Sequence, residues 1–275
     1  MRIFRAGLLV LCGVSVSIAQ QNASSSQVPA SPGVSTMVKP AAAAEITLPP
    51  SELSPKQVEW LQKSMADWAD LNRYREDDAQ LPKPAPGEQR VVFLGDSITD
   101  SWGRRHGKFF PGKPYINRGI SGQVTPQMLV RFQQDVLALQ PSVVVILAGI
   151  NDIAGNYGPE TLPQIEDNFR SMVALAKANH VRVVLSSVLP AKLFPWRRDV
   201  DPREEVIALN KWLQSYAAEQ QLVFLNYYPS LAESDGGMRP ELAEDKYIHP
   251  NDAGYAVMEP LAEAAIEEAL KRPQP

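Results

Sequence analysis

The sequence predicts a three-layer α/β sandwich built on a parallel β-sheet. From Arg90 onward, short and uninterrupted runs of Val, Ile and Leu recur, and such runs are typical of parallel strands buried on both faces. Between these runs lie longer segments whose apolar residues recur at helical spacing. Because the two patterns alternate to the end of the sequence, helices are expected to connect successive parallel strands.

The first part of the chain is expected to lie outside this domain. Residues 1–19 combine Arg2 and Arg5 with an apolar run and the small-residue sequence Ser-Ile-Ala, which is the layout of a cleaved secretory signal peptide. The run is shorter than the roughly 20 residues that span a membrane, so we expect export to the periplasm or the extracellular space without stable membrane insertion. Residues 20–50 are rich in Ala, Ser and Pro and predict a disordered linker.

An N-terminal helix and a proline-rich connector are predicted over residues 51–87. Ser54 followed by Pro55 is typical of a helix start, and apolar residues at helical spacing continue to about Arg75. The prolines that follow would end this helix. Residues 88–275 would then form the α/β domain.

The strands and helices of that domain can be placed from the two patterns. The predicted strands are 91–94, a weaker one at 115–117, 143–148, 181–188 and 222–225. The predicted helices contain the apolar stripes 128–139, 165–176, 206–216 and 258–266. In open parallel sheets ligands bind at the carboxyl ends of the strands, so the residues that follow each strand are the candidates for function.

Composition excludes several kinds of site. A single Cys cannot form an internal disulfide, and with only three His a Cys/His zinc site is not expected. The 27 basic and 31 acidic residues give no excess of positive charge for a nucleic-acid partner. The sequence contains no Gly-x-Ser-x-Gly elbow, dinucleotide fingerprint, Walker loop or His-Glu-x-x-His motif. We therefore expect no metal and no cofactor.

The polar residues after the predicted strands suit acyl chemistry. Ser97 follows the first strand, where a helix cap would be an equally good reading, and its hydroxyl needs an adjacent imidazole to become a nucleophile. Gly122 lacks a Cβ and can bring a backbone N–H close to a ligand. The Asn151 amide could donate a further hydrogen bond to an oxyanion, although by itself it could equally be a turn residue.

One histidine is placed to act as the base. His106 lies in a polar loop, and His180 opens a strand at the end opposite the proposed site. His249 lies in the loop before the last helix, where the chain can return to the carboxyl edge of the sheet. A nearby carboxylate could hold its tautomer and stabilise the imidazolium.

Four segments resemble, in order, the four blocks of the GDSL/SGNH hydrolase superfamily. These segments are Gly-Asp-Ser-Ile-Thr at 95–99, the segment 117–122, Gly-Ile-Asn-Asp at 149–152 and His-Pro-Asn at 249–251. The resemblance covers about residues 90–270 and implies a flavodoxin-like α/β/α sandwich. It also implies that Ser97 is the nucleophile and His249 the base. The oxyanion hole would consist of the backbone N–H groups of Ser97 and Gly122 and the amide of Asn151.

One block departs from the family pattern. The family places an aspartate three residues before the histidine, and this chain has Lys246 there. We expect Asp245 to be the third catalytic residue, because a loop can absorb one extra residue by bulging. The alternative is a Ser–His dyad in which a backbone carbonyl holds the imidazole of His249.

Together these features predict an exported serine esterase that hydrolyses acyl or acetyl esters through an acyl-enzyme on Ser97. The absence of a long apolar insertion that could form a lid favours carbohydrate esters, and Phe194 and Trp196 are candidate substrate-binding residues. A lysophospholipase or thioesterase-type acylhydrolase is the first alternative. The second is a non-catalytic carbohydrate-binding protein that keeps the fold, which only the substitution at Lys246 favours.

Overall fold

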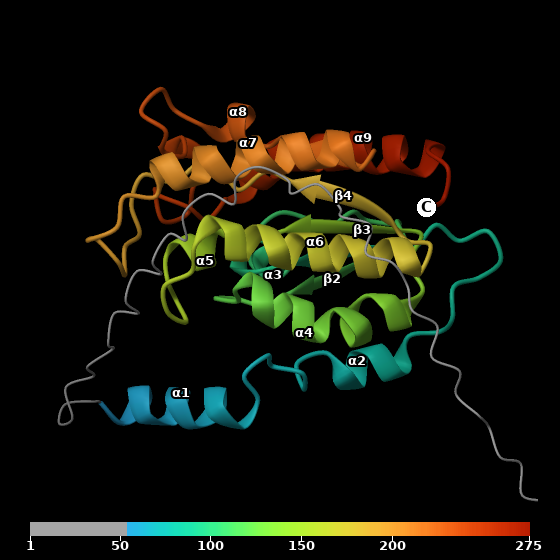
Figure 1. Cartoon of the computed structure of the whole chain (residues 1–275), viewed down its shortest axis with the longest axis horizontal. Coiled ribbons are helices and arrows are strands. Elements are labelled where there is room, and N and C mark those ends of the chain that lie inside the picture. The colour runs from blue at the N-terminus through green and yellow to red at the C-terminus, as the bar shows by residue number, and fades with distance from the viewer. Residues whose placement is uncertain (1–53) are drawn as a thin grey trace, which may run out of the picture. The chain divides into compact units, whose positions relative to one another are not determined.

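A computed structural model describes residues 54–275 of the chain (Figure 1). These residues form a five-stranded parallel sheet with the strand order β2-β1-β3-β4-β5. The strands are β1 (Val91–Gly95), β2 (Tyr115–Gly119), β3 (Val143–Leu147), β4 (Arg182–Ser186) and β5 (Val223–Leu225). The predicted signal peptide, the predicted linker and the first three residues of the predicted N-terminal segment 51–87 lie outside the described residues.

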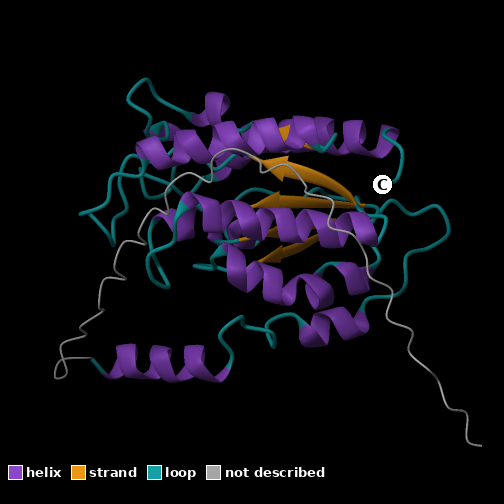
Figure 2. Cartoon of the chain, in the orientation of Figure 1, coloured by secondary structure: helices purple, strands orange, loops and turns teal. Residues whose placement is uncertain are grey.

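Helices cover both faces of the sheet (Figure 2). Those that follow β1, β2 and β3 are α3 (Ser97–Ser101), α4 (Thr125–Asp135), α5 (Ile150–Ile153) and α6 (Leu162–Ala178), and those that follow β4 and β5 are α7 (Arg203–Glu219), α8 (Tyr228–Leu231) and α9 (Asp252–Lys271). Short 3₁₀ turns occupy η1 (Leu137–Leu139) and η2 (Pro240–Leu242). The helix α6 packs between α4 and α7 on one face, and α9 packs against β3, β4 and β5 on the other. The predicted α/β/α sandwich is confirmed.

The runs of Val, Ile and Leu form the centre of the sheet for a simple reason. Every residue of β1 and β3 is buried, because helices cover both faces of these two strands. The weak apolar run at 115–117 forms β2, which pairs with β1 as an edge strand. The chain passes from β1 to β2 on one side and then to β3 on the other, so the topological switch point lies between β1 and β3.

A buried ion pair ties α4 to the carboxyl end of β1. Arg131 and Asp135 are fully buried, and their side chains lie 3.0 Å apart. The Arg131 guanidinium also donates to the backbone carbonyl of Gly95 at 3.0 Å and to the Gln123 side-chain oxygen at 2.6 Å. Breaking a buried pair of this kind costs about 3–5 kcal/mol, because it leaves an uncompensated charge in the core. The pair therefore connects α4 to the end of β1, two residues before Ser97, and to the segment that carries Gln123.

The N-terminal segment is organised differently from the prediction. A single helix up to Arg75 is wrong, because α1 (Pro55–Ala66) ends early and a separate α2 (Arg75–Gln80) follows. The helix ends because the Asp67 carboxylate accepts hydrogen bonds from the backbone N–H groups of Leu71 and Asn72 at 2.8 and 3.0 Å, which holds a turn there.

Three glutamines then fasten this turn to the domain. The side-chain amides of Gln127, Gln123 and Gln134 donate to the backbone carbonyls of Trp68, Ala69 and Leu71 at 2.5, 2.8 and 2.6 Å.

Within residues 54–275, no helix is both long enough and apolar enough to cross a membrane.

Candidate active site

Ser97 lies at the carboxyl end of β1, beside the topological switch point. The helix cap is the neighbouring Asp96, whose side chain accepts a hydrogen bond from the backbone N–H of Ile98 at 2.9 Å, so the capping role considered for Ser97 is wrong. The tight strand-to-helix turn depends on Gly95, where an added Cβ would lie 2.8 Å from the backbone oxygen of Leu147. The turn therefore leaves the Ser97 hydroxyl available for other partners.

The partner of that hydroxyl is His249, which is 152 residues further along the chain. The distance from Ser97 Oγ to His249 Nε2 is 2.9 Å, and the distance from His249 Nδ1 to Asp245 Oδ2 is 2.7 Å. With the ring proton on Nδ1, the hydroxyl donates to Nε2 and Nδ1 donates to the carboxylate. A nucleophile, a base and a group that orients the base thus form one continuous series.

The loop before His249 absorbs its extra residue at Lys246. This residue has a φ of 66°, in the left-handed region that a non-glycine residue seldom adopts, so the chain bulges there. The second oxygen of Asp245 accepts backbone N–H groups from Tyr247 at 2.8 Å and Ile248 at 2.8 Å. The imidazole is accordingly held by a carboxylate, and the dyad arrangement with a backbone carbonyl is wrong.

Hydrogen bonds and nearby charge favour the charged form of the Asp245 carboxyl group. Burial alone would raise the pKa of Asp245, but the hydrogen bonds from His249 and the two backbone N–H groups hold that pKa well below its usual range. Burial alone would lower the pKa of His249, but the hydrogen bond and the charge of Asp245 outweigh it and raise that pKa. The fully buried Asp96 has a pKa raised to about 7, because burial disfavours its charged form.

The predicted oxyanion donors lie on the other side of Ser97. Gly122 has a φ of 82°, which favours glycine, and a Cβ placed on it would meet nothing within 4 Å, so the space beside its Cα is open. Asn151 is the second residue of α5 and is 3% exposed. Together with Ser97 and His249 they line a cavity of about 440 Å³. The structure therefore gathers all the residues that the sequence proposed for the oxyanion hole and the base.

A hydrogen-bonded network sets the orientation of the Asn151 amide. Its nitrogen donates to the backbone carbonyl of Gln123 at 3.0 Å, and its oxygen accepts from the Asn156 side-chain nitrogen at 2.8 Å. The Asn156 oxygen in turn accepts from the indole N–H of Trp196 at 3.0 Å. Since both ends of the Asn151 amide are engaged, its second N–H has a fixed direction.

The two aromatic residues proposed to bind substrate differ in position. Phe194 is fully buried and packs against the Trp196 ring at 5.4 Å, so the prediction that it contacts substrate is wrong. Trp196 is 46% exposed, lines the cavity and lies 6.5 Å from the imidazole of His249, measured between ring centres.

Sequence reasoning missed Asn156 and Tyr157, which also line the cavity. Both follow Gly155 in the loop after the Gly-Ile-Asn-Asp segment, so a polar and an aromatic residue close to Asn151 in sequence were the available signal. A second cavity of about 340 Å³ also has Ser97 and His249 in its wall. It is lined in addition by Arg105 and Glu244, whose side chains form an ion pair at 2.8 Å.

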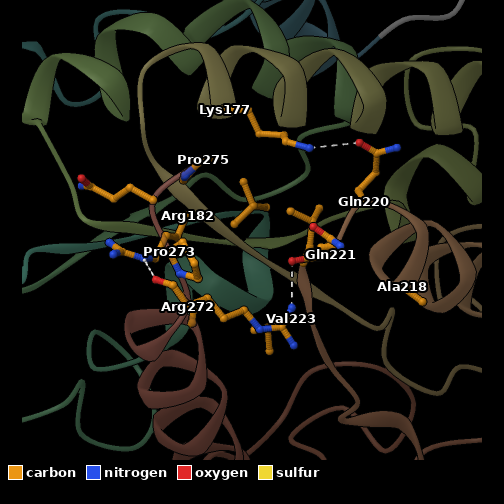
Figure 3. A pocket seen from close by; sticks show the side chains of 13 residues that line it. Lys177, Arg182, Ala218, Gln220, Gln221, Val223, Arg272, Pro273 and Pro275 are labelled. Atoms are coloured by element: carbon orange, nitrogen blue, oxygen red, sulfur yellow. Dashed lines mark hydrogen bonds between the residues drawn. The ribbon is translucent and has the colours of Figure 1, made fainter.

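A larger cavity lies at the amino ends of β4 and β5 (Figure 3). It has a volume of about 480 Å³ and is lined by Lys177, Arg182 and Arg272. Lys177 is in the last turn of α6 and Arg272 is the C-cap of α9, so both cations complement the negative ends of helices. This cavity contains none of the predicted site residues.

Among residues 54–275, no three side chains of His, Cys, Asp or Glu lie close enough together to hold a metal ion.

The known proteins that this chain resembles include ester hydrolases. A model of the GDSL-like lipase/acylhydrolase family matches residues 93–257. An acetylxylan esterase from Geobacillus stearothermophilus is 25% identical in an alignment of 211 residues, with 66% of this chain and 93% of that protein covered. An acetylxylan esterase from Xylanibacter ruminicola is 26% identical in an alignment of 223 residues, with 68% of this chain and 45% of that protein covered.

Two solved structures show more extensive similarity. A putative acylhydrolase from Bacteroides fragilis is 43% identical, with 74% of this chain and 99% of that chain covered and a TM-score of 0.72. A GDSL-like lipase from Bacteroides thetaiotaomicron is 42% identical, with 74% and 100% covered and a TM-score of 0.71.

Proposed function

The chain belongs to the GDSL-like lipase/acylhydrolase family of carboxylic ester hydrolases, and we propose that it cleaves its substrate through an acyl-enzyme on Ser97. The observation that carries this proposal is the hydrogen-bonded series from Ser97 Oγ to His249 and on to Asp245. Family membership also removes the non-catalytic binding protein considered from the sequence.

In the first half of the reaction, Ser97 Oγ attacks the carbonyl carbon and its proton moves to His249 Nε2. The Asp245 carboxylate holds the imidazole in the required tautomer and stabilises the imidazolium. The negative charge that forms on the carbonyl oxygen is stabilised by the backbone N–H groups of Ser97 and Gly122 and by the Asn151 amide. Collapse of this intermediate breaks the bond to the alcohol, which leaves with the proton from His249.

In the second half, a water molecule attacks the acyl group on Ser97 and gives its proton to His249. The same three donors stabilise the second oxyanion. Collapse releases the carboxylic acid and returns the proton to Ser97 Oγ. Each oxyanion donor is expected to contribute about 3–4 kcal/mol to the transition state, because it acts where charge develops.

For the substrate, we propose an acetylated carbohydrate. Two relatives described above support this choice, because both are acetylxylan esterases. The exposed indole of Trp196 beside His249 offers a flat apolar surface on which a sugar ring can pack.

We also propose that the enzyme is exported, on the strength of the signal-peptide layout of residues 1–19. The test is expression of the full chain followed by cell fractionation and N-terminal sequencing. Recovery in the cytoplasm with the first residues intact would contradict this part of the proposal.

The reaction is tested by Ser97→Ala with p-nitrophenyl acetate and acetylated xylan as substrates. We expect turnover to fall by at least about 10³-fold and labelling by a fluorophosphonate probe to disappear. The matched control is Ser215→Ala, which removes an exposed hydroxyl on α7 that bonds only to the Lys211 carbonyl. Wild-type turnover in the Ser97 variant would show that the nucleophile is a different group.

A further inference from the structure

Three exposed aromatic side chains line the Ser97 cavity or the cavity next to it. Trp196, Tyr157 and Trp68 are 46%, 37% and 42% exposed. Trp196 and Tyr157 line the cavity that contains Ser97, and Tyr157 and Trp68 line an adjoining cavity of about 190 Å³. Because Tyr157 and Ser121 belong to the walls of both cavities, the two cavities are neighbours, and we call the pair the groove.

The far end of this groove is rigidly attached to the domain. The backbone carbonyls of Trp68 and Ala69 accept hydrogen bonds from the Gln127 and Gln123 side chains, which are themselves buried. The carbonyl of Gln123 also accepts from the Asn151 amide, so the same residue contacts the oxyanion side and the turn that carries Trp68. A surface held in this way loses little conformational entropy when a ligand binds.

The chemistry of this end suits a sugar ring. The Trp68 and Tyr157 rings are nearly perpendicular, at 87° with centres 6.4 Å apart, so they form a corner instead of a closed stack. The face of an aromatic ring is negative and attracts the weakly positive C–H groups of a pyranose. The Asp70 carboxylate lines the same cavity and has no hydrogen-bond or ion-pair partner among residues 54–275, so it can accept sugar hydroxyl groups.

An aliphatic acyl chain fits this end poorly. Besides the two aromatic rings and Ile120, the cavity walls consist of polar side chains, namely Ser64, Asp67, Asp70, Ser121, Gln123 and Gln127. An alkyl chain laid against Asp70 would remove water from a carboxylate without replacing its hydrogen bonds. Sugar hydroxyl groups, by contrast, could donate hydrogen bonds to the carboxylate in place of the water they displace.

We therefore propose that Trp68 and Tyr157 form a subsite for a second sugar residue of an acetylated oligosaccharide, next to the acetylated sugar at Trp196. This inference rests on the proposed esterase function. Trp68 precedes the residues 93–257 that match the family, so the N-terminal segment would supply a specificity determinant that the catalytic core lacks.

The test compares Trp68→Ala with wild-type enzyme on p-nitrophenyl acetate, on an acetylated xylose and on an acetylated xylotetraose. We expect kcat/KM to fall about 10-fold on the oligosaccharide, mainly through KM, with no change on the two short substrates. Trp68→Phe, which keeps an aromatic face, should recover most of the loss. The matched control is Met65→Ala, because Met65 is 86% exposed on α1 and does not line the groove.

Three results would overturn the inference. One is an unchanged kcat/KM of Trp68→Ala on the oligosaccharide. Another is an equal loss on p-nitrophenyl acetate, which would indicate damage to the Ser97 site. The third is a selective loss on p-nitrophenyl octanoate, which would place an acyl chain in the groove. The esterase proposal is judged separately, by the effect of Ser97→Ala on p-nitrophenyl acetate.

Discussion

Asn156→Ala gives a quantitative test of how the oxyanion side is built. The Asn156 side chain donates to the Asn151 oxygen at 2.8 Å and accepts from the Trp196 indole at 3.0 Å. Removing it leaves the buried Asn151 oxygen without this donor and allows the amide to turn over, which would point an oxygen at the forming oxyanion. Asn156 would then affect the reaction as a positioning residue, through the Asn151 amide.

The size of the effect has a lower and an upper limit. Loss of one neutral hydrogen bond costs about 1 kcal/mol, and complete loss of an oxyanion donor costs about 3–4 kcal/mol. Because the bond from the Asn151 nitrogen to the Gln123 carbonyl opposes turning the amide over, we expect an intermediate cost of about 2 kcal/mol. This corresponds to a fall in kcat of about 30-fold.

The assay measures kcat and KM on p-nitrophenyl acetate, with the Tm of each variant as a check on folding. We expect kcat to fall and KM to remain within about two-fold. In an Asn151→Ala background, Asn156→Ala should have almost no further effect, because the group through which it acts is already missing. Additive losses in the double variant, or a full kcat in the single variant with an unchanged Tm, would refute this reasoning.

The remaining predictions concern two carboxyl groups. Asp245→Asn should lower kcat by up to about 10⁴-fold by removing the group that orients His249. Because Asp245 raises the pKa of His249, and only neutral His249 is a base, the acid limb of kcat/KM should also move to lower pH; a limb at unchanged pH would argue against this pairing. Burial and then the nearby Asp152 charge raise the pKa of Glu160 from 4.5 to about 7. Its folded form binds the proton more tightly, so its contribution to stability is complete below about pH 4.5 and is lost as the pH rises through 7. Glu160→Gln should therefore raise the Tm at pH 8 by a few degrees and flatten its decline between pH 5 and 8, and parallel Tm curves for the two proteins would contradict this.

The local sequence carried enough information to predict most of the fold and much of the site. Runs of Val, Ile and Leu predict buried parallel strands because burial on both faces requires apolar residues at every position. Ser97, Gly122 and Asn151 could be singled out because each follows a strand directly, and the carboxyl ends of parallel strands meet at one edge. His249 could be chosen because the other two histidines occupy a polar loop and the opposite edge.

Other features depend on contacts between residues that are distant in the sequence. Phe194 and Trp196 are two positions apart in one loop, and only packing decides that the first is buried and the second lines the cavity. The turn that ends α1 is local, because the Asp67 carboxylate holds it. Its position against the domain is long-range, because glutamines about 60 residues away bind its carbonyls.

The sequence by itself thus determined the parallel α/β sheet and the set of residues from which a hydrolase site could be made, because both follow from short-range patterns of burial and polarity. The tertiary structure decided the rest. It placed the Asp245 carboxylate on His249 through a left-handed Lys246, and it joined Asn156 to Asn151 and Trp68 to the Ser97 groove. Such directions depend on backbone dihedral angles and on long-range hydrogen bonds, which the chain acquires only when it folds.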